Sequence, residues 1–225
     1  MSVVDAPVRL GIELGGNTCF EDECVAFAHN LHLQMDSGKY DVCATMPLPR
    51  SREAWEAEHR TARKRAWHAE HAGYWAKTLH REQWSTDILE INLSRPYRQG
   101  RPMDNSYHHP TTDALPDYPC GMHAIRGYGV WQLERWSEDH AIERLVAYMF
   151  VYRAGDLALV SQVLGHAAHE PSGIMYLLFR HALEAEGKIA PIFFNTMEDS
   201  GALPIECETV VIVPQLIRAL ASIFE

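Results

Sequence analysis

The residues best suited to chemistry are two histidines three positions apart, His166 and His169, in the sequence Gly-His-Ala-Ala-His. They lie between an apolar run and a segment with the features of a helix beginning near Ser172. A neutral imidazole at such a junction can accept a proton from an attacking amine. We therefore predict that one of the pair is a catalytic base. The alternative is that a histidine only caps the helix or bonds to a strand carbonyl.

Two apolar runs must position this pair, and both are rich in Val, Leu, Tyr and Phe. This composition is typical of strands buried on both faces, so we predict strands over 141–153 and 157–164. The turn between them contains Asp156, a third catalytic candidate, although Gly-Asp is common in turns for conformational reasons alone. We expect the following helix to have Ser172 as its N-cap and Gly187 as its C-terminal stop.

The rest of the chain predicts further helices and strands. Apolar periodicity and turn residues indicate helices over 51–72, 82–93 and 215–224, and strands over 74–79, 123–133, 188–195 and 208–213. In the helix over 82–93 we expect four residues to point inward: Ile88, Leu89, Ile91 and Leu93. Five prolines exclude a regular element from 95–122. A loop of this length is usually functional or mobile.

Pro47 and Pro49 mark a boundary in this organisation. We interpret residues 1–48 as an irregular α+β N-terminal extension and residues 49–225 as the main domain.

The order helix, strand, helix, loop, three-strand meander, helix and strand resembles the GNAT superfamily of N-acyltransferases over residues 50–213. The resemblance implies an α/β fold with a mixed, mostly antiparallel central sheet flanked by helices. It also implies an enzyme that moves an acyl group to an amine. In this family a Gln/Arg-x-x-Gly-x-Gly/Ala pattern precedes the central helix, and its backbone N–H groups hold the pyrophosphate of acyl-CoA. Residues 162–167, Gln-Val-Leu-Gly-His-Ala, match that pattern.

A donor site follows from this resemblance, for acetyl-CoA or another acyl or aminoacyl donor. We assign seven residues to it: Gln162, Val163, Leu164, Gly165, Ala167, Ser172 and Asn195. Two departures from the family stand beside the match. The helix is expected to begin several residues after the motif, and the segment after Asn195 lacks the tyrosine that serves the family as general acid.

The long loop is the candidate site for a small-molecule or base amine acceptor. Arg98, Gln99 and Arg101 surround a glycine, and two guanidinium groups can grip a carboxylate or phosphate through paired hydrogen bonds. Tyr107, further along, either stacks on a substrate or covers the core. Tyr148, Phe150 and Tyr152 occupy alternate positions and therefore share one face of their strand. In a GNAT-like fold this strand lines the acceptor cleft. The alternative is that these side chains face the core.

The helix over 51–72 carries a basic outer face that suggests a second function. Arg60, Arg63, Lys64 and Trp67 lie on one side of it, away from an apolar stripe. Such a face can contact nucleic acid, as in GNAT-like domains that use aminoacyl-tRNA as donor or in an enzyme that modifies a DNA base. The alternative is an ordinary solvated face. The formal net charge of −10 disfavours indiscriminate binding of nucleic acid.

A metal-binding module is the third class of function. Cys19, Cys24, His29 and His32 are the residue types of a zinc site, but their spacing is more compact than that of a zinc finger. We expect no metal.

The five scattered cysteines indicate free thiols, and no apolar stretch approaches a membrane span or a signal peptide. A cytoplasmic protein without membrane contact is therefore expected. Nothing in the sequence predicts the oligomeric state.

Overall fold

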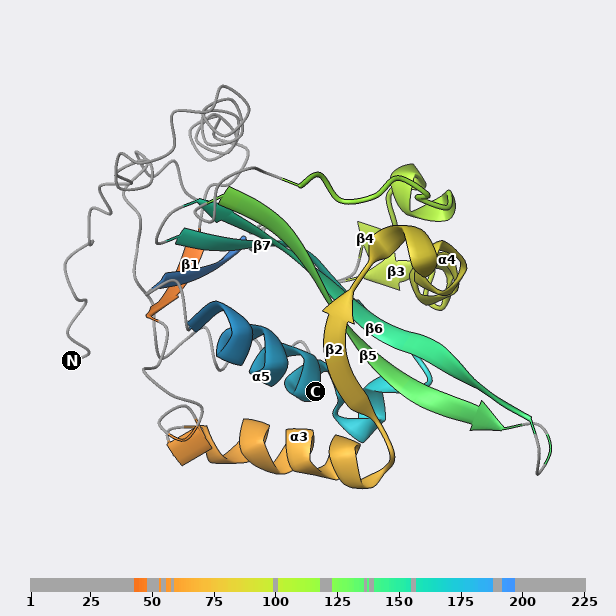
Figure 1. Ribbon diagram of the computed structural model, residues 1–225, viewed down its shortest axis with the longest axis horizontal. Helices are drawn as coiled ribbons and strands as arrows, with labels where there is room; N and C mark the ends of the chain where they lie inside the picture. The colour runs from red at the N-terminus through yellow and green to blue at the C-terminus, as the bar shows by residue number, and fades with distance from the viewer. Residues whose placement is uncertain are drawn as a thin grey trace.

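A six-stranded sheet forms the centre of the computed structural model, which describes residues 43–47, 53, 56, 57, 59–98, 101–117, 123–135, 137, 140–154, 157–187 and 192–196 (Figure 1). The strand order is β1 (Cys43–Pro47), β8 (Ile192–Thr196), β7 (Leu157–Gly165), β6 (Ala141–Ala154), β5 (His123–Arg135) and β2 (Trp75–Leu79). Neighbours are antiparallel except β7 and β8, which are parallel. The predicted fold class, α/β with a mixed, mostly antiparallel sheet, is confirmed. So is the order of elements on which the resemblance to the GNAT superfamily rests.

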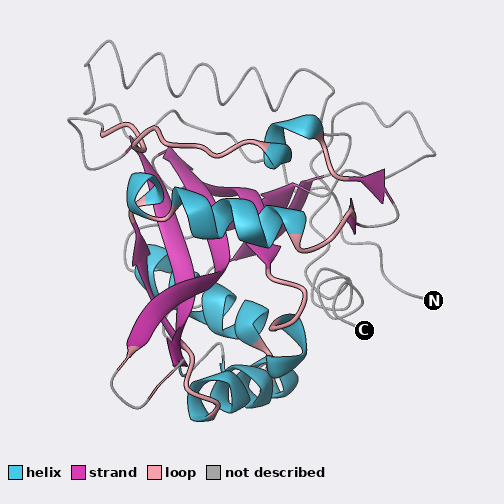
Figure 2. Ribbon diagram, turned by 90° about the vertical axis from the view of Figure 1, so that its right-hand side faces the viewer, coloured by secondary structure: helices cyan, strands magenta, loops and turns pink. Residues whose placement is uncertain are grey.

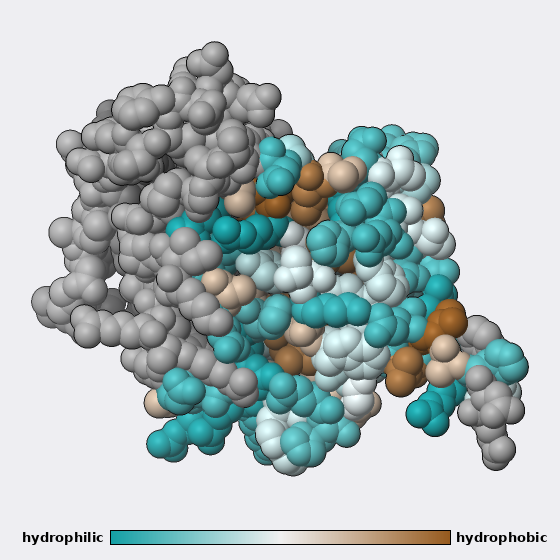
Figure 3. Space-filling view, in the orientation of Figure 1, coloured by the Kyte–Doolittle hydropathy of each residue, from teal (hydrophilic) through white to brown (hydrophobic). Residues whose placement is uncertain are grey.

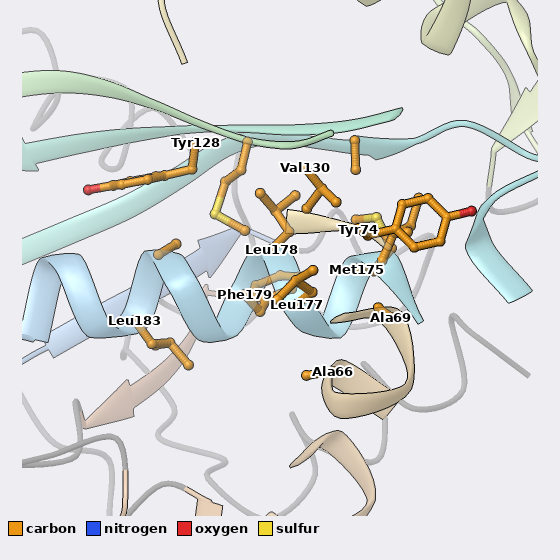
Figure 4. Close-up of a cluster of buried hydrophobic side chains, with 14 of the residues drawn as sticks. Ala66, Ala69, Tyr74, Tyr128, Val130, Met175, Leu177, Leu178, Phe179 and Leu183 are labelled. Atoms are coloured by element: carbon orange, nitrogen blue, oxygen red, sulfur yellow. The ribbon is translucent and has the colours of Figure 1, made fainter. Parts of the chain in front are cut away.

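Helices cover both faces of this sheet (Figure 2). Helix α4 (Ser85–Leu93) packs on one face, and α5 (Ile174–Gly187) crosses the other. Helix α3 (Arg60–His71) packs against α5 and forms an outer layer (Figure 1). One buried cluster joins α3, α5 and the sheet through residues such as Ala66, Val130 and Leu178 (Figure 4). A second cluster lies beneath α4 and includes Trp131 and Tyr148.

The prediction for the inward face of α4 is wrong at one end. Leu93 is 54% exposed, whereas Asp87 and Asn92 are buried. Asp87 accepts the Leu145 N–H at 3.2 Å, and Asn92 accepts the Tyr148 hydroxyl at 2.7 Å. Because β6 supplies partners for these polar groups, their burial costs little, and periodicity of apolar residues alone does not reveal it.

Other predicted boundaries also need correction. Residues 95–122 contain a short hairpin, β3 (Tyr97–Arg98) with β4 (Arg101–Pro102), and a 3-10 turn, η3 (Asn105–His108), where no regular element was expected. The helix predicted over 82–93 is split into a 3-10 turn, η2 (Arg81–Gln83), and α4.

The helix ends differ from the prediction in a similar way. Ser172 is not a helix N-cap, since it lies in a 3-10 turn, η4 (Glu170–Ser172), and Gly173 separates it from α5. Gly187 ends α5 as predicted. Helix α3 begins at Arg60, with His59 as an N-cap that makes no side-chain capping bond. The predicted start at residue 51 and the elements predicted over 208–213 and 215–224 lie outside the described residues.

The C-terminal end of α5 is held by a buried carboxylate. Glu186 is fully buried and accepts hydrogen bonds from the Tyr128 hydroxyl at 2.6 Å, from Arg126 Nη1 at 3.0 and 3.2 Å, and from Arg153 Nη1 at 3.3 Å. Burial and the neighbouring Glu186 charge raise the pKa of Tyr128 well above its ordinary value of 10.0, so its hydroxyl keeps the proton that it donates. This network ties the helix to β5 and β6.

The N-terminal end of α5 is held by a close backbone approach. Gly173 has φ +84°, and a Cβ there would lie 2.5 Å from the carbonyl oxygen of Arg65 in α3. Gly73, after α3, also has a positive φ, of +88°, in a turn where Tyr74 N–H bonds to Ala69 O. A Cβ at Gly73 would meet no atom within 4 Å. The two glycines therefore share a backbone conformation but differ in their surroundings.

This difference yields a stability prediction. Gly73→Ala should cost about 1–2 kcal/mol for the left-handed conformation alone. Gly173→Ala should cost about 1–3 kcal/mol more, because the new methyl group forces α3 away from α5. Equilibrium denaturation of both variants measures the difference. Equal losses would contradict a tight Arg65–Gly173 contact.

Candidate functional site

The loop between β7 and α5 uses its backbone N–H groups within the protein. Ala167 N–H donates to Ser94 Oγ at 3.1 Å, and Ala168 N–H to His166 Nδ1 at 3.3 Å. The N–H groups of His166, His169, Glu170, Ser172 and Gly173 donate to backbone carbonyls. Residues 162–165 belong to β7 and pair with β6. The motif is thus an ordered strand end and turn, and the N–H groups of the turn are already bonded within the protein.

Both candidate histidines lie at this strand end and contact each other. Their ring centroids are 5.1 Å apart, and the Tyr74 hydroxyl lies 3.0 Å from His169 Nδ1. Figure 4 shows Tyr74 at the edge of the apolar cluster with its hydroxyl pointing away from it. Burial lowers the pKa of His169, and the nearby His166 lowers it further. His169 is therefore neutral near pH 7.

The hydrogen bonds distinguish the two imidazoles chemically. His166 Nδ1 accepts the Ala168 N–H, so a neutral His166 carries its proton on Nε2. His169 can instead donate from Nδ1 to the Tyr74 oxygen, which leaves a lone pair on Nε2. In that tautomer His169 is the better proton acceptor of the pair.

The C-terminal end of α4 clamps the same loop. Ser94 Oγ accepts the Ala167 N–H while bonding to Ile91 O at 2.6 Å, and Arg95 forms an ion pair with Glu170. The segment that follows α4, which holds the predicted acceptor residues, is therefore connected to the loop that holds the histidines.

A cavity of about 680 Å³ lies beside this loop, between α3 and η4. Its lining consists of Arg60, Thr61, Lys64, Arg65, His68, Ala72, Pro171 and Ser172 and is therefore rich in basic side chains. His169 precedes η4, whose Pro171 and Ser172 form the far wall. The edge of the molecule where α3 lies is coloured mainly as hydrophilic in Figure 3. An anion fits this lining.

The charges of α3 oppose what a free helix prefers. Its first turn has no acidic residue and no capping side chain, yet Arg60, Arg63, Lys64 and Arg65 gather near its N-terminus. Cations there are unfavourable, because the helix dipole is positive at that end. Among the described residues, no carboxylate pairs with these four cations. Glu56 and Glu70 pair with Arg180 of α5 instead.

A second feature lies further back along β7. Its pairing with β6 shifts register so that Ser161 has no partner opposite in β6. Among the described residues, the pairing of β8 with β7 ends at Val160. Bulges of this kind often adjoin active sites.

The other predicted site residues are placed less informatively. Tyr107 is half-buried against the α4 cluster, and its carbonyl accepts the Asn92 amide at 3.2 Å, which favours the covering role. Tyr152 is partly buried on β6. The β3–β4 register sets Arg98 directly opposite Arg101. Asn195 pairs with Val160 in the parallel ladder.

Several predicted site residues lie outside the described residues. They are Asp156, Gln99, Cys19, Cys24, His29 and His32. In the part of the chain that the structure describes, no group of three or more His, Cys, Asp or Glu side chains is arranged to hold a metal ion. Within that same part, no helix is long and apolar enough to cross a membrane.

Solved structures similar to this chain are remote. The C-terminal DUF2156 domain of an Agrobacterium fabrum protein assigned as a lysylphosphatidylglycerol synthetase has TM-score 0.42 and 14% identity, over 69% of this chain and 46% of that one. The L-PGS of Bacillus licheniformis gives 0.39 and 14%, over 87% and 56%. A GCN5-related N-acetyltransferase from Kribbella flavida gives 0.35 and 18%, over 60% and 44%. This chain spans about half of each, and TM-scores this low carry no argument about activity.

Sequence comparison finds a short match near the C-terminal end of the described residues. The family "Aconitate hydratase 2 N-terminus" matches residues 180–214. Aconitate hydratase B is 91% identical over 22 residues in Synechocystis sp. and 86% identical over 22 residues in Escherichia coli. Each match covers 10% of this chain and 2% of the relative's length. A shared segment this short assigns neither a family nor an activity.

Sequence reasoning missed two residues of this site: Tyr74 and His68. The spacing contained a signal for His68, which is four residues after Lys64 and therefore on the same helix face. Tyr74 is recognisable only once His169 is seen to lie beside it.

The lowered pKa of His169 predicts how stability depends on pH. Below the ordinary value of 6.5 the unfolded chain binds a proton that folded His169 resists, so stability falls as pH falls. His169→Gln, which keeps a hydrogen-bonding side chain beside Tyr74, should make the loss between about pH 7 and about pH 5 shallower. Denaturation across this range tests it. Exposed His109→Gln is the control, and equal pH dependence in both variants would contradict the assignment.

Proposed function

We propose that this protein is an acyltransferase that moves an acyl or aminoacyl group from a phosphate-bearing donor, such as acetyl-CoA, to an amine. The observation that carries the proposal is the basic cavity beside the β7–α5 junction, bordered by Arg60, Lys64, Arg65 and His68. In a GNAT-like fold this junction is where the donor phosphate is expected. Here side chains of α3 take the role that the family gives to loop backbone.

The donor lies along α3 in this proposal. Helix α3 (Arg60–His71) is about 18 Å long. Arg60 at its start and the C-cap residue Ala72 both border the cavity. The phosphates contact the cations near Arg60 and Lys64. The other end of the donor reaches the end of the helix, where Tyr74 and His169 meet.

His169 is the proton acceptor for an amine bound at the end of β7. The amine nitrogen attacks the acyl carbonyl carbon, and the bond from that carbon to the donor sulfur or oxygen breaks. The nitrogen proton passes to His169 Nε2, and the leaving group later takes it up. Tyr74 accepts the Nδ1–H and orients the ring. Arg98 and Arg101 hold an anionic part of the acceptor.

Charge reversal within the cavity tests the donor site. Arg60→Glu or Lys64→Glu should weaken binding of acetyl-CoA or pyrophosphate by roughly 10- to 100-fold, since each substitution removes a charge-assisted contact. Binding by calorimetry and thermal shift reports the loss. A donor at a hundred times its Kd should stabilise the wild type by about 2.7 kcal/mol.

Arg63→Glu is the matched control, because it reverses a charge on the same helix outside the cavity. It should bind the donor nearly as well as the wild type does. If Arg63→Glu loses as much as Arg60→Glu, the cavity is not the donor site and only the overall charge of α3 matters.

A nucleic-acid-modifying enzyme is the second candidate, with a charged tRNA as donor or a base as acceptor. The specific observation in its favour is that Arg63, exposed and outside the cavity, extends the basic face of α3. Phosphate contacts of this kind weaken steeply with salt. An affinity for RNA or DNA that depends on Arg63 and on salt would select this candidate. Retention insensitive to salt would exclude it.

A further inference from the structure

An exposed tryptophan adjoins the basic cavity on α3. Trp67 is 48% exposed although it is a large apolar side chain. Its ring stacks on that of His71, with centroids 3.7 Å apart and planes 30° apart. It also meets the edge of His68, a cavity residue, at 5.2 Å. An aromatic surface therefore continues the cavity lining into solvent.

This aromatic surface is organised before any ligand arrives. His71 Nδ1 bonds to the Trp67 carbonyl oxygen at 2.9 Å, which fixes the His71 ring against the indole. A ligand that stacks on a ring already held in place loses less freedom on binding. The indole packs in no buried cluster of the described residues, so the core has no evident need for it.

The neighbouring charges indicate which planar group fits. Lys64 lies three residues before Trp67 and four before His68, so it neighbours both on the helix surface, and the His68 ring contacts the indole. A ligand with phosphate in the cavity holds its next group near the indole. Nucleobases are planar groups attached to phosphate through a sugar, and they stack on exposed aromatic rings in a sequence-tolerant way.

We infer that Trp67, with His71 behind it, is a stacking platform for the base of a nucleoside phosphate whose phosphates occupy the Arg60–Lys64–His68 cavity. The inference rests on the proposed donor site and adds its substrate class: a donor that carries a nucleoside. A free nucleotide cofactor and the end of a nucleic acid strand share this chemistry. A donor with phosphate but no base does not.

The experiment measures binding by the full chain of three probes: adenosine 3′,5′-bisphosphate, inorganic pyrophosphate and a short single-stranded oligoadenylate. Trp67→Ala should weaken adenosine bisphosphate binding about 5- to 150-fold and leave pyrophosphate binding unchanged. Trp67→Phe, which keeps an aromatic ring, should lose less. Because Trp67 is exposed, neither variant should change the unfolding midpoint appreciably.

Binding of the oligoadenylate shows whether the nucleoside belongs to a free cofactor or to the end of a nucleic acid. Tighter binding of oligoadenylate than of the bisphosphate, with a steep salt dependence, identifies a nucleic acid end. Equal or weaker binding identifies a free cofactor. Either result supports the platform, provided that it depends on Trp67.

Two further outcomes overturn the inference. If Trp67→Ala binds adenosine bisphosphate as tightly as the wild type does, the platform is not used. Pyrophosphate binding that still depends on Lys64 would then leave the proposed donor site standing. If none of the three probes binds, both the platform and the donor site are wrong.

Discussion

The hydrogen bonds to the buried carboxylate of Glu186 are the interaction on which the rest of the structure depends. A carboxylate out of water is tolerated only with several donors, and here Tyr128, Arg126 and Arg153 supply them. Removing one partner of such a group costs about 3–5 kcal/mol, so α5 cannot slide along the sheet without a large penalty. With its C-terminal end fixed in this way and its apolar face packed on the sheet, the N-terminal end of α5 lies against α3. There Gly173 admits the backbone of α3, and the basic cavity forms between α3 and η4.

The basic residues at the start of helix α3, beside this cavity, lower the stability of the fold. Arg60 and Arg63 lie in its first turn, where each cation costs about 0.3–1 kcal/mol against the helix dipole. One charge-assisted hydrogen bond to a bound anion contributes about 1.5–3 kcal/mol, enough to offset that cost. Natural sequences violate such local preferences mainly at functional sites. The apolar stripe of α3, with Ala66 and Ala69 fully buried, holds the cationic face outward.

Much of the fold was predictable because it follows from local patterns. Strands β6 and β7 contain long apolar runs, and α3 has an apolar stripe, so these elements were recognised. The buried polar residues of α4 were not, because their burial depends on partners 50 or more residues away, such as Tyr148 and Leu145. The cavity has the same cause. Basic residues of α3 were identified from their spacing, but the packing of α3 against η4 is a tertiary contact that no local pattern encodes.

The segment that resembles a pyrophosphate loop matches the family in residue type, but its hydrogen bonds differ from those expected. Residues 162–167 have the expected types, yet His166 and Ala167 donate their N–H groups to Val146 O and Ser94 Oγ. Backbone donors that are already bonded in this way cannot hold an anion, whereas the arginine and lysine side chains that line the cavity can. Side chains reach further than the backbone of a rigid loop does, but they constrain the position of a ligand less. A second contact would then set the orientation of the ligand, and the stacked ring of Trp67 lies beside His68 of the cavity lining.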